Sequence, residues 1–562
     1  MTTIRRPGRP TRRRTTSALA LAAAGVLLLA GCGGDSDASG GSGGDGGEPV
    51  KGGTLNVSFF PDNPTFKCVD PFQVYWIEHR TVIRNWADSL TDQDPETGEI
   101  KPWLAESWEV SDDGLTYTFH LKDGVTFSNG EPLDAQAVAD NAQGWIDTVK
   151  ATNGAAYGAS YILGLQSAKA VDPATVEFDF TTPNSSFLQA SSTTNLAIID
   201  PTAYAETPED RCLGKGLFGS GAFTLDHYTP DKEVVLKKRD TPYTSASSLV
   251  DNQGDAYLDE VKFDYVAEDS VRVGNLTSGV IDIAWPRNPI TPEDQEVIKA
   301  SGATVESRSL PGVSYTQFAN ASAGRVLSDP AVRHAILKAT DVKTYAETIF
   351  GPDYPVVAGP FDATTPYFKD ESDKLAYDPD GAEQLLDDAG WKVGDDGYRS
   401  KDGQALKIVL PVTQFSAGPE LLQDQLKQVG INLELHTLTT AEQSTYLTAG
   451  DYDLTQTYFT RADPGALQFI LNPDLSNSKA LANNAASPEQ IARIKELFAQ
   501  AVQSTDDDQT AQAYADLQDY LVDEAIVFPI FERVQTAGVS AGVHGFAFTS
   551  ESFLRLNDLW KS

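Results

Sequence analysis

Before about residue 300, apolar residues mostly alternate with polar ones. In residues 108–121, Tyr117, Phe119 and Leu121 alternate strictly after a turn at 112–114. The same period of two recurs at 176–180, 261–265 and 281–285. Alternation of this kind is typical of a strand that buries one face. We therefore expect this half of the chain to consist mainly of strands, with a hairpin at 108–121.

After about residue 305 the apolar period becomes that of a helix. Residues 382–389 carry apolar side chains at i, i+3, i+4 and i+7 and are followed by Gly390. Residues 421–429 repeat the pattern up to Gly430, and 431–435 then alternate as a strand. Ser487 and Gln490 form the pattern of a capping box at the start of another helix. The succession of helix, glycine and strand is typical of an α/β sheet, so the pattern predicts an α/β fold with two lobes.

The first 31 residues contain six arginines and no acid, and they end in an apolar segment, 18–30. About 13 apolar residues are too few to span a bilayer, and the pattern predicts a secretory signal peptide at 1–31. Leu29-Ala30-Gly31-Cys32 resembles the lipobox of bacterial lipoproteins, which implies that Cys32 is acylated and holds the chain on the extracytoplasmic face of the cell membrane. The alternative is an ordinary secretory signal. Arg13-Arg14 leaves the choice between general secretory and twin-arginine export open.

Residues 32–50 are rich in Gly, Ser and Asp and predict a flexible tether. The formal net charge of −37 becomes −43 once the six arginines are lost. A chain this acidic is a poor partner for nucleic acid or anionic lipid. Its length favours two or more domains.

After Cys32 the chain has two cysteines, Cys68 and Cys212. In an oxidising compartment two cysteines more often pair than stay free, so we predict a disulfide; the alternative is two buried thiols. The six histidines show no metal-ligand spacing. We therefore expect no metal and no cofactor.

Three short segments match functional motifs but lack the other residues or elements that those motifs require. Gly538-Val539-Ser540-Ala541-Gly542 fits the nucleophile elbow, but no helix pattern follows it. Ser476-Asn477-Ser478-Lys479 has no partner motifs, and residues 92–100 depart from the spacing of a calcium loop. We expect turns at these places and no enzymatic activity.

Several longer segments carry a more specific signal. They are "KGGTLNV" at Lys51, "GEIKPWLAESWEVSDDGLTYTFHLKDGVTFSNGEPLDAQAV" at Gly98, "GSGAFTL" at Gly219, "DPAVRHAILKATD" at Asp329 and "AEQLLDDAGW" at Ala382. Together they resemble the dipeptide, oligopeptide and nickel class of bacterial extracytoplasmic solute-binding proteins, family 5, which serve ABC importers. The resemblance extends from Lys51 to the C-terminus.

This resemblance implies a two-lobe fold of the periplasmic-binding-protein kind, type II, with an extra β-rich subdomain in domain I and two hinge strands. On that template, domain I comprises 51–305 and 527–562, and domain II comprises 306–526. A ligand held between the lobes closes them, because contacts to both halves exist only in the closed state.

The resemblance also suggests where a ligand binds. In dipeptide binders an aspartate near a later Asp-Pro pair holds the peptide's α-amine, and an arginine holds its carboxylate. Here "YFTRADPG" offers Tyr458, Arg461 and Asp463, but the position of the amine-binding acid reads Thr460-Arg461-Ala462. Arg461 could meet a carboxylate bidentately, or it could pair with Asp463 or another acid. Further candidates, each of which could equally belong to a lobe core, are Trp76, Trp285, Tyr315 and Phe415.

These observations predict a monomeric lipoprotein that captures an oligopeptide or similar small polar solute and delivers it to an ABC permease. Nickel is disfavoured because no histidine lies near the candidate segments. The alternative is a surface lipoprotein that senses a solute and signals to a membrane partner without transport. The sequence does not identify the solute, its length or the permease.

Overall fold

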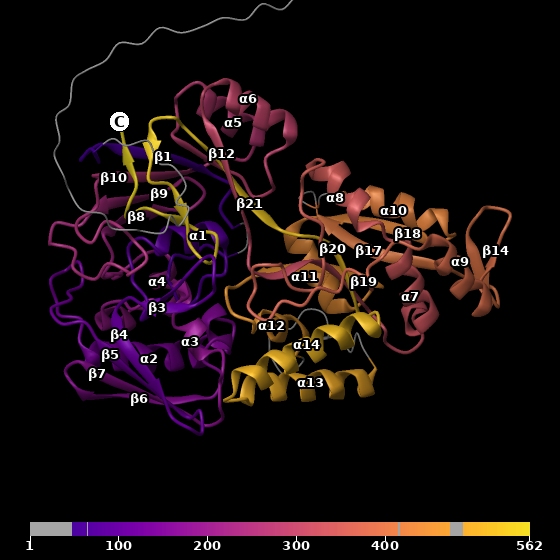
Figure 1. Ribbon diagram of the computed structural model, residues 1–562, viewed down its shortest axis with the longest axis horizontal. Coiled ribbons are helices and arrows are strands. Elements are labelled where there is room, and N and C mark those ends of the chain that lie inside the picture. Colours follow the sequence, from indigo (N-terminus) through magenta and orange to yellow (C-terminus); the bar gives the residue numbers. More distant parts are fainter. Residues whose placement is uncertain (1–47, 64–65, 414–415, 417, 473–486) are drawn as a thin grey trace, which may run out of the picture. The chain divides into compact units, whose positions relative to one another are not determined.

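The computed structural model describes residues 48–63, 66–413, 416, 418–472 and 487–562, which belong to one compact unit (Figure 1). Cys32 with its signal segment, Phe415 and Ser476 lie outside the described residues. None of the helices within those ranges is long and apolar enough to cross a bilayer.

The first lobe, lobe I, is organised around a seven-stranded sheet. Its strand order is β12 (Thr304–Ser309), β21 (Val534–Val539), β11 (Ile283–Trp285), β1 (Thr54–Phe59), β10 (Glu260–Tyr265), β9 (Glu233–Lys238) and β8 (Phe223–Thr229). β1 pairs in parallel with β10 and β11, and the other pairs are antiparallel. Val57, Phe263 and Trp285 lie in the core of this sheet and are fully buried. Strands far apart in the sequence therefore share one core.

Lobe I also contains a β-rich subdomain, seen at the lower left of Figure 1. Its antiparallel sheet has the order β4 (Ala105–Val110), β5 (Thr116–Leu121), β7 (Thr175–Phe180) and β6 (Leu165–Asp172), and α2 (Ala135–Ala151) packs against it. β4 and β5 form the hairpin expected at 108–121. Tyr117, Phe119 and Leu121 are buried, so the alternation does reflect one buried face.

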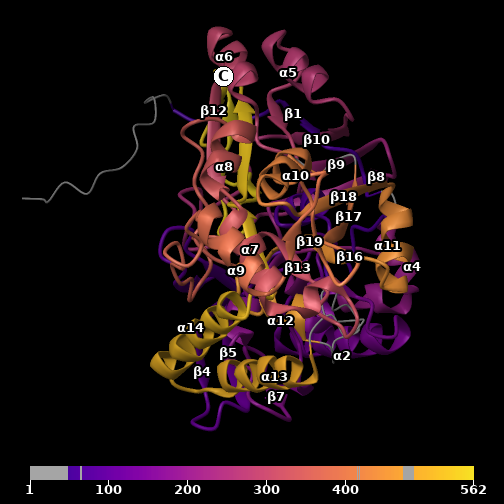
Figure 2. The same ribbon diagram turned by 90° about the vertical axis from the view of Figure 1, so that its right-hand side faces the viewer.

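The second lobe, lobe II, has a three-stranded sheet of β19 (Leu454–Thr460), β13 (Gly312–Ala319) and β20 (Val527–Phe531), beside the parallel pair β17 (Lys407–Thr413) and β18 (Asn432–Leu438). Its main helices are α7 (Pro330–Ala339), α8 (Val342–Phe350), α9 (Pro379–Asp388), α10 (Pro419–Gln428), α13 (Pro488–Gln503) and α14 (Asp507–Asp523). Figure 2 shows α13 and α14 below the sheet strands. α9 ends just before Gly390 and α10 just before Gly430, both at positive φ, and the capping box of Ser487 and Gln490 is present. The helix signals in the sequence are thus confirmed.

The remaining elements are short. They are α1 (Ile77–Ile83), β2 (Thr91–Gln93), β3 (Ile100–Pro102), α3 (Phe187–Ala190), α4 (Pro208–Cys212), α5 (Asp269–Thr277), α6 (Pro292–Ala300), β14 (Lys392–Val393), β15 (Arg399–Lys401), β16 (Gln404–Ala405), α11 (Thr440–Ala449), α12 (Ala466–Leu471), β22 (Val543–His544), β23 (Ala547–Phe548), β24 (Leu554–Arg555) and β25 (Trp560–Lys561). Residues 94–99 form the turn between β2 and β3, with Asp94 accepting hydrogen bonds from the backbone N–H groups of Glu96 and Thr97. Ser540 lies in the turn between β21 and β22.

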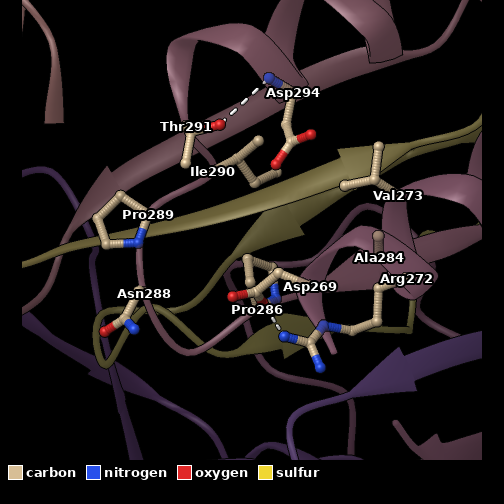
Figure 3. Close-up of a pocket in the computed structure, with 10 residues that line it drawn as sticks. All are labelled: Asp269, Arg272, Val273, Ala284, Pro286, Asn288, Pro289, Ile290, Thr291 and Asp294. Atoms are coloured by element: carbon tan, nitrogen blue, oxygen red, sulfur yellow. Dashed lines mark hydrogen bonds and ion pairs between the residues drawn. The ribbon is translucent and has the colours of Figure 1, made fainter. Parts of the chain in front are cut away.

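α5 and α6 pack against β11, β12 and β21 and leave a small cavity beside Arg272 and Pro286 (Figure 3). Its volume of about 30 Å³ is enough for water but not for a solute. We therefore do not regard this cavity as a binding site.

The chain crosses between the two large sheets twice. β12 belongs to lobe I and β13 to lobe II, so the first crossing lies at 310–311; β20 and β21 place the second at 532–533. Both crossings come a few residues later than the expected boundaries at 305/306 and 526/527. The first crossing follows Ser309 because β12 pairs with β21 in lobe I up to that residue, and the second follows Phe531 because β20 pairs with β13 in lobe II.

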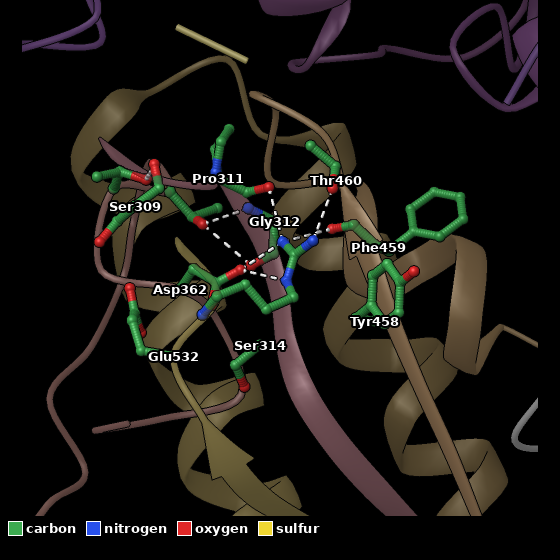
Figure 4. Close-up of polar contacts among 12 residues, drawn as sticks. Ser309, Pro311, Gly312, Ser314, Asp362, Tyr458, Phe459, Thr460 and Glu532 are labelled. Atoms are coloured by element: carbon green, nitrogen blue, oxygen red, sulfur yellow. Dashed lines mark hydrogen bonds and ion pairs between the residues drawn. The ribbon is translucent and has the colours of Figure 1, made fainter. Parts of the chain in front are cut away.

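The side chain of Arg533, at the second crossing, contacts the first crossing; Figure 4 labels its partners Pro311, Asp362 and Thr460. Arg533 donates to the Pro311 carbonyl oxygen at 3.1 Å, to Thr460 Oγ1 at 2.6 Å and to Asp362 Oδ2 through Nε at 2.8 Å. Its own backbone N–H donates to Asp362 Oδ1 at 2.9 Å. The neighbouring Glu532 is buried and accepts a hydrogen bond from the Ala363 N–H at 2.8 Å. The hinge is therefore a buried cluster of one cation and two acids.

Lobe I contains the disulfide between Cys68 and Cys212, which are 144 residues apart in the sequence. The bond joins the segment before α1 to the end of α4, and the Val69 N–H donates to the Cys212 carbonyl oxygen at 2.9 Å. Both cysteines are buried.

We expect the double substitution Cys68→Ser/Cys212→Ser to lower the free energy of unfolding by about 2–5 kcal/mol, since the bond restricts a long loop in the unfolded chain. Urea denaturation of the oxidised protein and of the variant measures this. A reductant should shift the midpoint of the parent protein and leave that of the variant unchanged. Equal midpoints for the oxidised protein and the variant would contradict the prediction.

The hinge cluster makes stability depend on pH. Burial, with the Asp362 carboxylate adding repulsion, raises the pKa of Glu532 to about 9, whereas the ordinary value is 4.5. Between these two values the folded protein holds a proton that the unfolded chain has lost, so this group's contribution to stability falls as pH rises. We expect Glu532→Gln, which keeps the acceptor oxygen for the Ala363 N–H, to reduce this fall between about pH 5 and pH 9.

Urea denaturation across that pH range tests the expectation, with the exposed Glu383→Gln as a matched control. The control should follow the parent curve. If Glu532→Gln also follows it, Glu532 does not take up a proton on folding.

Candidate functional site

A cavity of about 550 Å³ lies between the two lobes, within the size range of small-solute sites. Lobe I contributes Phe60, Trp76, Glu78, Tyr157 and Arg287 to its wall. Lobe II contributes Tyr315, Gln456 and Tyr458, and Arg533 of the second crossing completes it. We call this cavity the interlobe cleft. Because its wall comes from both lobes, a solute inside it touches both.

The lobe II wall is a stack of aromatic rings on neighbouring strands. Tyr315 on β13 lies 4.3 Å, centroid to centroid, from Phe531 on β20 and 5.8 Å from Tyr458 on β19. The three strands are paired in one sheet, so this arrangement follows from their register. Neutral polar groups such as Gln456, which donates to Ser416 Oγ at 2.6 Å, complete this side. The wall is apolar with dispersed hydrogen-bonding groups.

Tyr157 and Arg80 of lobe I close one end of the cleft against lobe II. The Tyr157 ring stacks on Phe459 at 5.2 Å, and its hydroxyl donates to the Thr460 carbonyl oxygen at 3.3 Å. Arg80 Nη1 donates to the same oxygen at 2.9 Å, and its Nη2 forms an ion pair with Glu551. The two lobes are therefore in direct contact at this end.

Arg287 crosses the cleft from lobe I. Its Nε donates to the Tyr458 hydroxyl oxygen at 3.1 Å, and its Nη2 donates to the same oxygen. Its guanidinium carbon lies 4.0 Å from the centroid of the Trp76 ring, in cation–π contact. Nη1 has no hydrogen-bond partner and lies 3.7 Å from Glu78 Oε2, which also has none. Burial raises the pKa of Glu78, and the charge of Arg287 opposes that rise.

Three of the residues expected to contact a ligand, Trp76, Tyr315 and Tyr458, do line the cleft. Trp285 does not: it is fully buried in the core of the lobe I sheet, 6.2 Å from Phe59 and 5.8 Å from Phe548 between ring centroids. Its place in a central strand sends the side chain into the core and not into the cleft. Phe415 lies outside the described residues.

Arg461 and Asp463 form a buried ion pair away from the cleft wall. Arg461 Nε donates to Asp463 Oδ2 at 2.7 Å and its Nη2 to Oδ1 at 2.8 Å. Its Nη1 donates to Ser160 Oγ in lobe I at 2.7 Å, and the guanidinium carbon lies 3.7 Å from the centroid of the Tyr161 ring. Of the two roles considered for Arg461, the structure shows the pairing with Asp463.

Sequence reasoning did not identify Arg287, Glu78 or Tyr157. The first of these had a usable signal, because Arg287 comes two residues after the end of a strand, and strand ends in α/β sheets commonly border ligand sites. Glu78 and Tyr157 belong to a short helix and a single 3₁₀ turn, where no periodicity marks their direction.

Within the described ranges, no group of three or more His, Cys, Asp or Glu side chains is placed to hold a metal ion.

Comparison with known proteins gives a consistent result. Residues 99–480, more than half of the chain, match the bacterial extracellular solute-binding proteins, family 5 Middle. The chain is 24% identical over 492 residues to the glutathione-binding protein GsiB of Shigella flexneri, covering 86% of this chain and 90% of the relative. It is also 24% identical over 494 residues to the nickel-binding periplasmic protein of Escherichia coli strain K12, covering 86% and 87%.

Solved structures show the same fold. NikA from Brucella suis in complex with Fe(III)-EDTA superimposes with a TM-score of 0.76 at 25% identity, covering 91% of this chain and all of that one. The oligopeptide-binding protein AppA from Bacillus subtilis, in complex with a nonapeptide, gives 0.72 at 18% identity, covering 92% of this chain and all of that one. With two lobes, two crossings and a cleft between them, the chain belongs to the bacterial extracellular solute-binding proteins of family 5, the non-enzymatic solute-binding components of ABC importers.

Proposed function

We propose that this protein is the lipid-anchored receptor of an ABC importer, and that it captures an oligopeptide or a similar small polar solute in the interlobe cleft and passes it to the permease. The observation that carries the proposal is the cleft wall, which is shared by both lobes. A solute that touches both walls stabilises the closed state over the open one, since those contacts exist together only there.

The chemistry of the wall supports a peptide-like solute. Trp76, Tyr315 and Tyr458 offer aromatic surface, and Gln456 offers a side-chain amide. Apolar surface with a few polar groups suits a ligand that has a polar backbone and varied side chains. Among the relatives, AppA is described with a nonapeptide and GsiB as glutathione-binding, which agrees with this class of solute.

The proposed domains follow the sheets. Domain I would comprise the residues before the first crossing at 310–311 and after the second at 532–533, and domain II the residues between them. The two crossings are short, and they would act as the hinge between two bodies that move as units.

Native mass spectrometry of the mature protein, with a panel of peptides two to five residues long, tests the capture. We expect one bound peptide per chain and a smaller radius of gyration in solution scattering when peptide is present. Trp76→Ala and Tyr315→Ala should each weaken binding by about 2 kcal/mol, the effect typical of a central aromatic contact.

The matched control is Tyr377→Ala, since Tyr377 is exposed and lies outside the cleft wall. Its affinity should equal that of the parent protein. An unchanged scattering curve together with consumption of the added solute would refute the proposal.

The predicted anchor gives a separate test. We expect Cys32→Ala to move the protein from the membrane fraction of the producing cells into the soluble extracytoplasmic fraction, because no acyl chain would hold it. Cell fractionation followed by immunoblotting measures this. The protein carrying Cys68→Ser/Cys212→Ser is the control and should stay with the membrane. Membrane retention of the Cys32 variant would show that something else holds the protein there.

A further inference from the structure

The C-terminal turn of α13, in lobe II, is capped by a residue of lobe I. Figures 1 and 2 show α13 beside the β-rich subdomain. The backbone N–H of Ser185 donates to the Val502 carbonyl oxygen at 2.9 Å, and the Ser185 hydroxyl donates to the Ala501 carbonyl oxygen at 2.9 Å. The last four carbonyl groups of an α-helix have no partner within the helix. One residue of lobe I therefore supplies two of the hydrogen bonds that complete the end of a helix in lobe II.

Ser185 belongs to the connection between β7 and α3, which its own subdomain holds in place. The carbonyl oxygen of the neighbouring Asn184 accepts a hydrogen bond from the Tyr117 hydroxyl at 2.7 Å. The Asn184 side-chain amide donates to the carbonyl oxygens of Tyr161 and Leu163, both at 3.3 Å. Because these bonds lie within lobe I, the two donors of Ser185 keep their direction whether or not α13 is beside them.

The turn between β4 and β5 makes a second contact at the same place. Gly114 in this turn is buried and has a φ of 67°, in the left-handed region. A Cβ atom built on it would lie 2.7 Å from Thr505 Cγ2 and 3.3 Å from Pro183 Cβ. Thr505 follows the end of α13 by two residues. The tip of the hairpin in lobe I is thus covered in part by lobe II.

We call the contacts of Ser185 and Gly114 with lobe II the subdomain latch. None of the residues that form it lines the interlobe cleft. A solute in the cleft does not touch the latch, so the latch can act on the solute only through the arrangement of the lobes. In the same arrangement Arg287 of lobe I reaches Tyr458 of lobe II across the cleft. The latch therefore forms together with the closed cleft.

We propose that the subdomain latch stabilises the closed arrangement of the lobes from outside the cleft, and that it tightens the binding of every solute by the same factor. The inference rests on the proposed function and makes Ser185 a positioning residue. A protein whose closed state is only partly populated binds its solute more weakly in proportion to that population. The latch raises the population, but it has no contact that could distinguish one solute from another.

The first test removes one hydrogen bond of the latch from the full mature protein. In Ser185→Ala the Ala501 carbonyl oxygen loses its partner, so we expect a larger radius of gyration in solution scattering without solute. Peptides of two to five residues that bind the parent protein then serve as probes in isothermal titration calorimetry. Their dissociation constants should all rise by one common factor of about two to ten, the range of one net hydrogen bond.

Two further variants show whether the hydroxyl is the cause. Ser185→Thr keeps the hydroxyl and should restore most of the parent's affinity. Ser192→Ala is the matched control, because Ser192 Oγ donates to the Gln189 carbonyl oxygen at 2.7 Å within lobe I. This control should change neither the scattering curve nor the dissociation constants.

The second test places a side chain in the latch. Asn adopts left-handed backbone conformations more readily than most residues, so Gly114→Asn should keep the turn while its side chain meets Thr505. We expect a larger radius of gyration and a common loss of affinity. Gly124→Asn is the matched control: Gly124 follows β5, has a φ of 73°, and no described atom lies within 4 Å of a Cβ built on it. It should behave as the parent does.

The outcomes separate the latch from the proposed function. Equal scattering curves for the unliganded parent, Ser185→Ala and Gly114→Asn would overturn the latch and leave the proposed function intact. Dissociation constants that rise for some peptides and not for others would overturn it as well, since the latch cannot discriminate between solutes. If no peptide binds the parent protein, the proposed function fails, and the scattering curves still decide on the latch. If Gly114→Asn does not fold, Ser185→Ala and Ser185→Thr decide.

Discussion

The hydrogen bonds of Arg533 tie the two crossings to each other and to lobe II. One guanidinium at the second crossing contacts the backbone of the first crossing at Pro311 and the edge strand of lobe II at Thr460. A buried cation is tolerated only when it is paired and hydrogen-bonded, and Asp362 supplies the paired charge. The two crossings are thereby held together as one unit.

The contacts between the lobes are both polar and apolar, because one buried apolar cluster runs from lobe I into lobe II and the Tyr157 ring stacks on Phe459. Val57 and Phe263 fill the lobe I core, whereas the contacts between lobes include the Arg461 hydrogen bond to Ser160 and the Tyr157 hydrogen bond to Thr460. Polar contacts can be exchanged for water at modest net cost, but a large apolar surface cannot. Separating the lobes therefore costs more at the Tyr157–Phe459 stack, where apolar rings would be exposed, than at the hydrogen bonds.

The fold could be predicted from the sequence to the extent that it depends on periodicity. Alternation identified β5 and β7, and the helix period followed by glycine identified α9 and α10, because each of these elements buries one face along its length. The exact ends of the strands that border the crossings do not follow from periodicity, because the pairing of β20 with β13 is a contact between segments about 210 residues apart, which no local pattern encodes. For the site, Tyr315 and Tyr458 line the cleft, as expected of aromatic residues near strand ends. Trp285 is also an aromatic residue at a strand end, but it is fully buried in the core of lobe I.

Arginine shows most clearly what the sequence leaves undetermined. Arg461 follows a strand and precedes an Asp-Pro pair, yet its donors are taken by Asp463 and Ser160. Arg287 also follows a strand, but the carboxylate nearest to it, Glu78, stays 3.7 Å away without a hydrogen bond. The difference lies in whether the fold brings an acid within hydrogen-bonding distance of the guanidinium. In the sequence, Asp463 is two residues from Arg461, whereas Glu78 is 209 residues from Arg287. The partner of an arginine that follows a strand is therefore set by the long-range fold and not by the residues beside it in the sequence.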